Sequence, residues 1–453
     1  MTSLSRIDTY VEEHLEQSIA ELSRLCGQPS VSAQGLGISE CAELVATMLR
    51  ARSFAVEIIP TAGHPIVYGE APGRNAKTLL FYNHYDVQPP EPLELWDSPP
   101  FEPTLRDGAL FARGVSDDKG HIVCRLAALD AVKAAFGEYP CRVKFLIEGE
   151  EETSSANLHQ FVVDNVEKLK ADACIWEFGG VNHEDIPVEY LGLRGICYVE
   201  LSVETGTLDA HSGLGGSIFP NAAWRLTWAL ASLKGHDERI RIAGFYDGVV
   251  PPTARDLELL ATLPEQADYL RRQYGLNNFL KGISGGMELH REEVFVPTCT
   301  ICGLTAGYQG PGSKTVLPAR ASAKVDFRLV PDQDPLDILR KLRAHLDREG
   351  FEDVQIAYLG GEAPARTDPD DPFVKIVLDT GREVYGRDML IQPLIGGSGP
   401  SYPFVHHLGL PVATAGVGYP GARAHAPNEN MRLKDFKTGI LHTARILVKF
   451  GGL

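Results

Sequence analysis

The sequence contains few cysteines, a deficit of positive charge and no long apolar run. Eight Cys among 453 residues are too few for a disulfide scaffold, so we predict buried free thiols. Lys and Arg number 43 against 60 Asp and Glu, which gives a formal net charge of −17. This negative field repels nucleic-acid phosphates and anionic lipid headgroups. Neither a nucleic-acid partner nor a membrane partner is therefore expected.

The sequence also lacks the pattern of a membrane-spanning or targeting segment. The uncharged stretch 403–422 contains three Pro and four Gly, which exclude a transmembrane helix. The first residues include no basic region followed by an apolar core, and three Glu occur within residues 12–16. A secretory signal peptide has the opposite pattern. We expect a cytoplasmic protein.

The remaining composition is that of a globular protein with room for two or three domains. Apolar residues at three- and four-residue spacing predict amphipathic helices over 4–25 and 118–136. Short β-rich runs that end in polar clusters predict strands at 78–82, 143–147 and 173–176. Strands that alternate with helices predict an α/β sheet domain, in which sites form where strands end.

A different pattern begins near residue 195. Residues 198–204 and 323–329 alternate apolar and polar side chains, which is typical of strands with one exposed face. Helical patterns lie between them, at 221–233 and 257–274. We predict a separate α+β domain inserted into the first.

Four polar clusters follow or flank the predicted strands and helix of the first domain: 84–86, 116–120, 148–152 and 176–177. His84 and Asp86 are two residues apart on an extended segment, so both point the same way and the acid can orient the imidazole toward a metal. Taken singly, His84 is equally consistent with a satisfied core histidine. The acids taken alone favour a solvated charge run.

The placement of these acids favours a metal site. Several carboxylates would converge at one edge of the sheet, and like charges at short range disfavour joint ionisation. Two divalent metal ions would relieve this repulsion. A dinuclear site with ions roughly 3.5 to 4 Å apart needs a bridging carboxylate, terminal His or acid ligands, and a free carboxylate that accepts a proton from water. The clusters supply each of these groups.

At these clusters the sequence resembles the M20 family of metallopeptidases, and in particular its dipeptidase branch, which includes carnosinases and the cytosolic nonspecific dipeptidase. The resemblance covers nearly the whole length. It rests on these segments: 83–90, Trp96 with 100–101, 112–120, 148–155, 328–331, and His425 with 428–429.

The resemblance implies five metal ligands. His84 and Glu177 would bind one ion, Glu152 and His425 would bind the other, and Asp117 would bridge both. The dipeptidase branch often has Asp at the position of Glu177, whose longer side chain still reaches a metal.

The resemblance also implies three catalytic residues. Glu151 matches the general base, and Asp86 matches the acid that orients His84. His211 resembles the residue that crosses a dimer interface to stabilise the oxyanion in the partner's site, with an ordinary loop histidine as the alternative. The peptide bond that follows Asp117 is cis in this family.

Three further residues resemble the part of the family's site that binds substrate. Arg328 matches the residue for the substrate carboxylate, a task suited to its planar fork of donors. The alternative role for Arg328 is a salt bridge with Asp326 on the same strand face. Gly397 and Ser398 lie in a loop that would hydrogen-bond the C-terminal end of the substrate.

We therefore expect a two-domain fold with a zinc-peptidase-like catalytic α/β domain, residues 1–195 and 361–453, and an inserted α+β lid and dimerisation domain, residues 196–360. The expected activity is hydrolysis of dipeptides or similarly small peptides with a free C-terminal carboxylate. The expected cofactor is two divalent metal ions per chain, Zn or alternatively Mn or Co, in a homodimer. The alternatives are an N-acyl amino acid deacylase or desuccinylase of the same family, and a catalytically inactive binding protein.

Overall fold

The computed structural model describes residues 2–453 and divides them between two compact units. Of the described residues, the first unit comprises 2–192, Arg366–Pro393 and Pro400–Leu453, and the second comprises Leu193–Ala365 and Leu394–Gly399. Gly397 and Ser398 therefore belong to the second unit, whereas the predicted metal ligands belong to the first.

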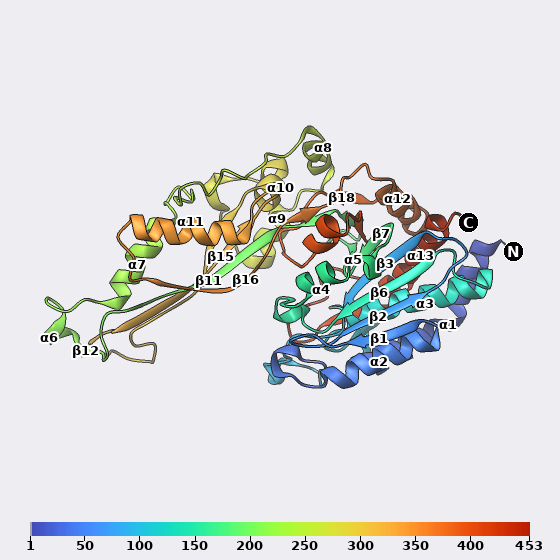
Figure 1. The fold of residues 1–453 in the computed structure, drawn as a ribbon, viewed down its shortest axis with the longest axis horizontal. Helices are drawn as coiled ribbons and strands as arrows, with labels where there is room; N and C mark the ends of the chain where they lie inside the picture. Colours follow the sequence, from blue (N-terminus) through green and yellow to red (C-terminus); the bar gives the residue numbers. More distant parts are fainter. Residues whose placement is uncertain (1) are drawn as a thin grey trace. The chain divides into compact units, whose positions relative to one another are not determined.

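A six-stranded sheet in the order β1-β2-β6-β3-β7-β19 forms the centre of the first unit (Figure 1). Its strands are β1 (Ala55–Ile59), β2 (Ile66–Ala71), β3 (Thr78–His84), β6 (Arg142–Glu148), β7 (Ala173–Trp176) and β19 (Val412–Thr414). The last four run parallel to one another, while β1 and β2 continue the sheet in antiparallel pairing. The carboxyl ends of β3, β6 and β7 consequently meet at one edge of the sheet, which is where α/β sheets place their sites.

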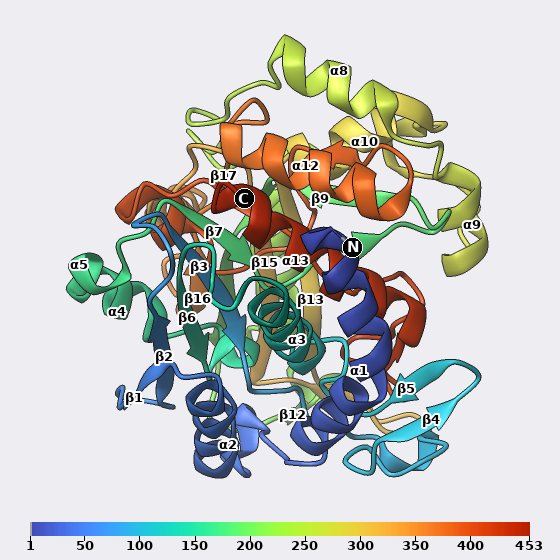
Figure 2. The ribbon, with the colours of Figure 1, turned by 90° about the vertical axis from the view of Figure 1, so that its right-hand side faces the viewer.

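Three helices lie side by side in the first unit (Figure 2): α1 (Ser3–Cys26), α3 (Lys119–Phe136) and α13 (Leu433–Phe450). Their apolar residues share one core with Phe81 and Phe145 of the sheet. On the other side of β3, Tyr82 stacks on Trp176, and Phe404 packs against both rings. Both faces of these central strands are therefore buried, as expected for parallel strands.

The second unit contains an antiparallel sheet in the order β13-β15-β11-β16. Its strands are β11 (Gly195–Glu204), β13 (Thr298–Ala306), β15 (Arg320–Leu329) and β16 (Gln355–Glu362). Burial alternates along β11 and β15, and their buried side chains pack against α7 (Ala222–Leu233) and α11 (Pro335–Arg348). The predicted strands with one covered face are confirmed.

The sequence-based interpretation is wrong for residues 257–274, which it assigned to one helical pattern. This region contains α8 (Ala254–Thr262) and α9 (Ala267–Tyr274), with Pro264 between them. Proline lacks the amide hydrogen and its ring clashes with the preceding turn, so a continuous helix cannot pass through it.

The remaining elements of the first unit are α2 (Ile38–Ala51), β4 (Thr104–Arg106), β5 (Ala109–Phe111), α4 (Leu158–Asp164), α5 (Val166–Leu169), β8 (Gly180–Val181), β9 (Pro187–Tyr190), α12 (Pro372–Tyr385), β18 (Leu390–Gln392) and β20 (Asn430–Arg432). Those of the second are β12 (Ala210–His211), α6 (Ser212–Gly215), α10 (Gly286–Phe295) and β14 (Val316–Leu317). Two further short strands, β10 (Gly192–Leu193) and β17 (Ala365–Arg366), pair with each other.

All eight cysteines are free thiols, and each is buried except Cys302, which is exposed. The prediction of buried free thiols therefore holds for seven of them. Within residues 2–453, no helix combines the length and the apolar character needed to cross a membrane.

Candidate metal site

The ends of three parallel strands bring the predicted ligands of the first unit together. His84 is the last residue of β3, Glu151 and Glu152 follow the end of β6, and Glu177 directly follows β7. His84 and Glu177 are buried, and the side chain of Glu152 is 3% exposed. The parallel direction of the strands is what places these side chains at one edge.

Asp117 lies between the two histidines. Its Oδ1 is 3.0 Å from His84 Nε2, and its Oδ2 is 2.9 Å from His425 Nε2. Glu152 Oε2 lies 3.2 Å from the same nitrogen of His425, and Glu177 Oε2 lies 3.9 Å from His84 Nε2. The structure thus brings the five predicted ligands close to one another, and Asp117 contacts both histidines.

The loop that carries Asp117 is held by Glu429, a fully buried carboxylate. Glu429 accepts hydrogen bonds from the main-chain N–H groups of Gly114, Ser116 and Asp117 and from the guanidinium of Arg113. Burial raises the pKa of Glu429 to about 7, and the charge of Arg113 opposes that shift. The peptide bond between Asp117 and Asp118 is cis, as the resemblance implies.

Asp86 contacts both His84 and the acidic turn after β6. His84 Nδ1 is 3.0 Å from the main-chain oxygen of Asp86 and 3.4 Å from its carboxylate Oδ1. The two carboxylate oxygens of Asp86 accept hydrogen bonds from the N–H groups of Glu151 and Glu152, at 3.2 and 3.1 Å. Asp86 therefore orients the His84 ring mainly through its carbonyl and uses its carboxylate to fix the acidic turn.

Burial is the main electrostatic feature of this cluster. It raises the pKa of Glu177 well above its usual value, and the charge of Glu151 adds to the shift. Burial likewise raises the pKa of Glu151, with a further contribution from Glu152. Burial also opposes ionisation of Asp117, but hydrogen bonds from His425 and His84 outweigh it and lower that pKa.

The chemistry of these donors fits divalent cations. Among residues 2–453, nothing donates a hydrogen bond to the buried oxygens Glu152 Oε1 and Glu177 Oε2, and an uncompensated buried carboxylate is costly. Two groups of potential ligand atoms meet here, namely His84, Asp117 and Glu152, and His84, Asp118 and Glu177. Imidazole nitrogen and carboxylate oxygen are donors that Zn and related divalent ions accept.

A buried polar network beneath the site was not predicted from the sequence. Arg125 of α3 is fully buried and donates to the carbonyls of Tyr82 and Trp176 and to the Asn83 side chain. Asn83 in turn donates to Asp118 Oδ2, which also accepts from the His84 N–H group at 3.2 Å.

His121, one turn before Arg125, extends this network. Its Nδ1 is 2.9 Å from Asp118 Oδ1, and its Nε2 accepts from the N–H of Val417. The available sequence signal was the presence of Arg125 and His121 within an otherwise apolar stretch of α3, residues 120–129, all of which are buried.

The second unit assembles the predicted substrate-binding residues. Arg328 Nη1 donates to Ser398 Oγ at 2.8 Å, and Arg328 Nε donates to Asp326 Oδ2 at 3.3 Å. Ser398 donates to the carbonyl of Gly195, and the carbonyl of Gly397 accepts from the N–H of Arg194. Arg328 thus makes the salt bridge with Asp326 that was its alternative role, and it also contacts the loop of Gly397 and Ser398 that was predicted to bind substrate.

His211 is exposed at the end of β12 in the second unit. Its Nδ1 accepts from the N–H of Gly213 at 3.0 Å, and its Nε2 lies 3.4 Å from Thr315 Oγ1. The hydrogen bond from Gly213 leaves the proton of a neutral ring on Nε2, so this nitrogen can donate to an oxyanion.

Comparison with known proteins identifies the family to which this chain belongs. A profile of peptidase family M20/M25/M40 matches residues 80–449, and the chain belongs to this family. It is similar to the solved structure of an M20 family metallo-carboxypeptidase from Sulfolobus solfataricus, with 36% identity, a TM-score of 0.92, and coverage of 96% of this chain and 99% of that one.

Two curated relatives have dipeptidase names. The Cys-Gly metallodipeptidase dug1 of Schizosaccharomyces pombe is 27% identical over 97% of this chain and 96% of its own length. The Beta-Ala-His dipeptidase of Mus musculus is 25% identical over 84% of this chain and 82% of its own. The predicted resemblance to the dipeptidase branch of the family is confirmed, as is the predicted fold class.

Proposed function

We propose that this protein is a metal-dependent dipeptidase, which hydrolyses dipeptides or similarly small peptides with a free C-terminal carboxylate. The observation that carries this proposal is the placement of Asp117 between His84 and His425, at 3.0 and 2.9 Å, with Glu151 in the adjacent turn. The two dipeptidase names among the relatives support the substrate class.

Two divalent ions per chain would be held by His84, Asp117, Glu152, Glu177 and His425. Zn is our proposal for the ions, with Mn and Co as alternatives, because the donors are imidazole nitrogen and carboxylate oxygen. The ions would supply Lewis acidity toward the scissile carbonyl and the attacking water.

Within this scheme Glu151 is the general base and acid. It accepts the proton of the attacking water and returns it to the leaving amine. Asp86 holds the main chain of Glu151 at 3.2 Å, so it positions the base as well as the His84 ring.

Arg328, Ser398 and Gly397 would receive the C-terminal carboxylate of the substrate. The guanidinium of Arg328 is already oriented by Asp326 and Ser398, which lowers the entropic cost of using it as a carboxylate clamp. A free carboxylate at the C-terminus is therefore part of the proposed specificity.

We propose residues 1–195 and 361–453 as the catalytic domain and residues 196–360 as a lid and dimerisation domain. The second unit exposes several large apolar side chains on and before α7, and the elements α6, β12 and α7 lie toward one end of that unit (Figure 1). These side chains are Leu208, Leu214, Ile218, Phe219, Trp224 and Trp228, each at least half exposed. Such a patch is typical of a protein interface, and a homodimer would cover it and bring His211 to the partner's site.

We place the enzyme in the cytoplasm. None of its eight cysteines forms a disulfide, and free thiols persist where glutathione and thioredoxin keep them reduced.

A carboxypeptidase acting on longer peptides is the second candidate. The solved relative with 36% identity is named a metallo-carboxypeptidase, and recognition of a C-terminal carboxylate would serve both activities. The N-acyl amino acid deacylase is less favoured, because the curated relatives named above have dipeptidase names.

The test is hydrolysis of a panel that contains dipeptides, their C-terminal amides, tripeptides and N-acyl amino acids. We expect free-acid dipeptides to be cleaved fastest and amidated dipeptides poorly, with activity lost on chelation and restored by added Zn, Mn or Co. Faster release of the C-terminal amino acid from tripeptides than from dipeptides would favour the carboxypeptidase. A preference for N-acyl amino acids would favour the deacylase. Full activity after complete removal of metal would refute the metal-dependent reaction.

A further inference from the structure

The second unit contains a cavity of about 380 Å³ that the proposed reaction does not use. Its walls come from α9, from the segment 279–283, from α10, and from β13 at the edge of the sheet. The volume falls within the range of small-molecule sites, roughly 300 to 1,000 Å³.

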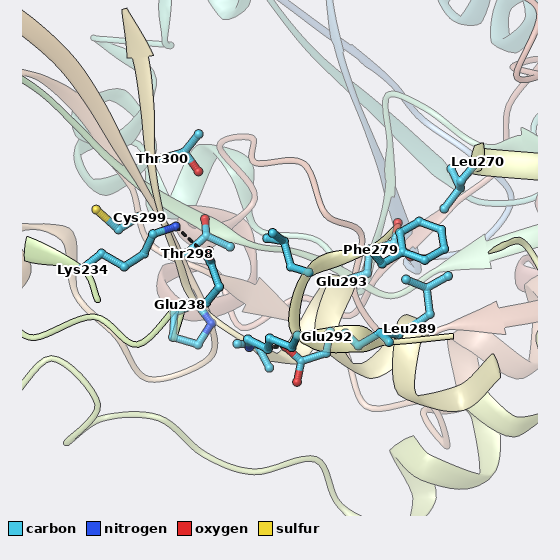
Figure 3. A pocket seen from close by; sticks show the side chains of 15 residues that line it. Lys234, Glu238, Leu270, Phe279, Leu289, Glu292, Glu293, Thr298, Cys299 and Thr300 are labelled. Carbon is cyan, nitrogen blue, oxygen red and sulfur yellow. Dashed lines mark hydrogen bonds and ion pairs between the residues drawn. The ribbon is translucent and has the colours of Figure 1, made fainter. Parts of the chain in front are cut away.

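The cavity has an apolar end and a charged end (Figure 3). Leu270, Phe279 and Leu289 form the apolar end and belong to a small cluster separate from the main core of the unit. Lys234 and Glu238 form the other end, where Lys234 Nζ and Glu238 Oε2 are 2.8 Å apart. A ligand that fills both ends must therefore carry charge on one side and apolar surface on the other.

The charged groups indicate which charge the ligand carries. The lining contains two Lys and three Glu, and the second Lys, Lys281, is itself paired with Glu292 at 2.6 Å. A simple carboxylate would meet an excess of acids, and a simple amine would leave Lys234 without a new partner. A zwitterion matches both groups, because its ammonium can pair with Glu238 and its carboxylate with Lys234.

We propose that this cavity binds a free α-amino acid with a large apolar side chain. The head group replaces the Lys234–Glu238 pair with two new ion pairs, and the side chain lies among Leu270, Phe279 and Leu289. Amino acids released by the proposed reaction belong to this class, but the site itself does not depend on that reaction.

The cavity adjoins the proposed carboxylate subsite without sharing its residues. Thr298 of the cavity wall is the direct partner of Arg328 across β13 and β15. The buried Arg194 guanidinium donates to the carbonyls of Glu293 and Val296, both in the wall, and to that of Arg328. Neighbouring cross-strand residues lie close enough to influence one another, so an occupied cavity borders directly on the residue proposed to bind substrate.

Calorimetric titration of the purified protein tests the ligand class. We expect L-phenylalanine to bind at least about tenfold more tightly than 3-phenylpropanoate or 2-phenylethylamine, because each analogue loses one charged hydrogen-bonding partner. Equal binding of either analogue would overturn the zwitterion assignment, and no detectable binding of L-phenylalanine at millimolar concentration would overturn the site.

Two variants and one control test the location. Leu280 lines the cavity and is 65% exposed, so Leu280→Asp adds a charge beside the apolar end with little risk to the fold. Leu276→Asp is the matched control, since Leu276 lies four residues earlier in the chain and is 41% exposed but does not line the cavity. We expect Leu280→Asp and Lys234→Met each to weaken binding by at least about tenfold, and Leu276→Asp to leave it unchanged.

A crystal soaked with 4-bromo-L-phenylalanine locates the ligand independently of activity. We expect anomalous scattering from bromine between Leu270, Phe279 and Leu289. Bromine found only elsewhere, or equal affinities of Leu280→Asp and Leu276→Asp for L-phenylalanine, would show that this cavity is not the binding site. Since neither measurement uses turnover, the outcome is separate from that of the proposed reaction.

Discussion

At the scale of single residues, Glu151 and Glu152 are adjacent carboxylates with different proposed roles. Glu152 Oε2 contacts His425 and the side-chain amide of Gln88, whereas Glu151 is proposed to move a proton. We expect Glu151→Gln to lower kcat at least about a hundredfold while both metal ions are retained, because the amide cannot act as a base. Elemental analysis and steady-state kinetics on the same preparation measure the two effects.

Glu152→Gln is the matched control for this prediction. It is the same chemical change one residue further along, and we expect it to weaken metal binding. If Glu151→Gln loses a metal and Glu152→Gln does not, the two roles are exchanged.

At the scale of secondary-structure elements, Arg125 joins α3 to the ends of β3 and β7. Its guanidinium binds the carbonyls of Tyr82 and Trp176, which precede the proposed ligands His84 and Glu177. We expect Arg125→Met to weaken metal affinity by about tenfold to a hundredfold, the usual cost of losing support behind a ligand. Arg125→Lys should recover part of this loss.

Competition with a chelator measures that metal affinity directly. Lys133→Met on the same helix is the control, because Lys133 lies beside the ring of Tyr139 and belongs to no part of the site. Unchanged metal affinity in Arg125→Met, with only a lower melting temperature, would show that Arg125 serves the fold alone.

A second element-scale contact joins α13 to α12. His442 is buried, its Nε2 lies 3.0 Å from the carbonyl of Val377, and burial lowers its pKa from 6.5 to about 4. Because the folded protein disfavours the protonated His442 ring, the unfolded chain takes up the proton first as the pH falls. The stability that the neutral ring contributes is therefore complete above pH 6.5 and is lost as the pH falls toward 4. The shift corresponds to about 3 kcal/mol across that window.

We expect His442→Gln to flatten the acid dependence of stability, because the amide still donates to the carbonyl of Val377 but does not titrate. Denaturant unfolding at pH 7 and at pH 4.5 measures the difference. The prediction fails if the free energy of unfolding of the unaltered protein and of His442→Gln falls by the same amount between these two pH values.

The elements themselves were largely predictable from local pattern. The strand expected at 173–176 is β7. The helix expected at 4–25 is α1, which extends one residue further at each end, and the helix expected at 118–136 is α3, which begins one residue later. Their apolar spacing reflects which faces are buried, and that is decided locally. The pattern failed at 257–274, where one proline outweighed a continuous helical spacing.

Support residues of the site were harder to predict. His84 and Glu177 could be found because each lies at or just after the end of a strand, where α/β sheets form their sites. Arg125 and His121 lie in the part of α3, residues 119–129, that is buried on all sides, where periodicity carries no information about partners. Their roles depend on contacts with β3, β7 and Val417, segments distant in sequence.

At the scale of the whole molecule, the chain separates the proposed catalytic groups between two units. The five proposed ligands and Glu151 belong to the first unit, and His211 belongs to the second. We predict a homodimer in which each active site receives His211 from the neighbouring subunit. The exposed apolar residues near His211, such as Trp224 at 58% and Trp228 at 55% exposure, would be buried in that dimer.

Mixed dimers test this arrangement. His211→Ala and Glu151→Gln chains should each be nearly inactive alone, since loss of an oxyanion donor costs on the order of a hundredfold to a thousandfold in kcat. A dimer of one chain of each kind contains one site with native Glu151 and, from the partner, native His211. Activity should therefore return when the two chains are mixed under conditions that exchange subunits, with subunit exchange monitored by differently tagged chains. If tagged mixed dimers form and remain as inactive as their parents, His211 acts within its own chain or takes no part in the reaction.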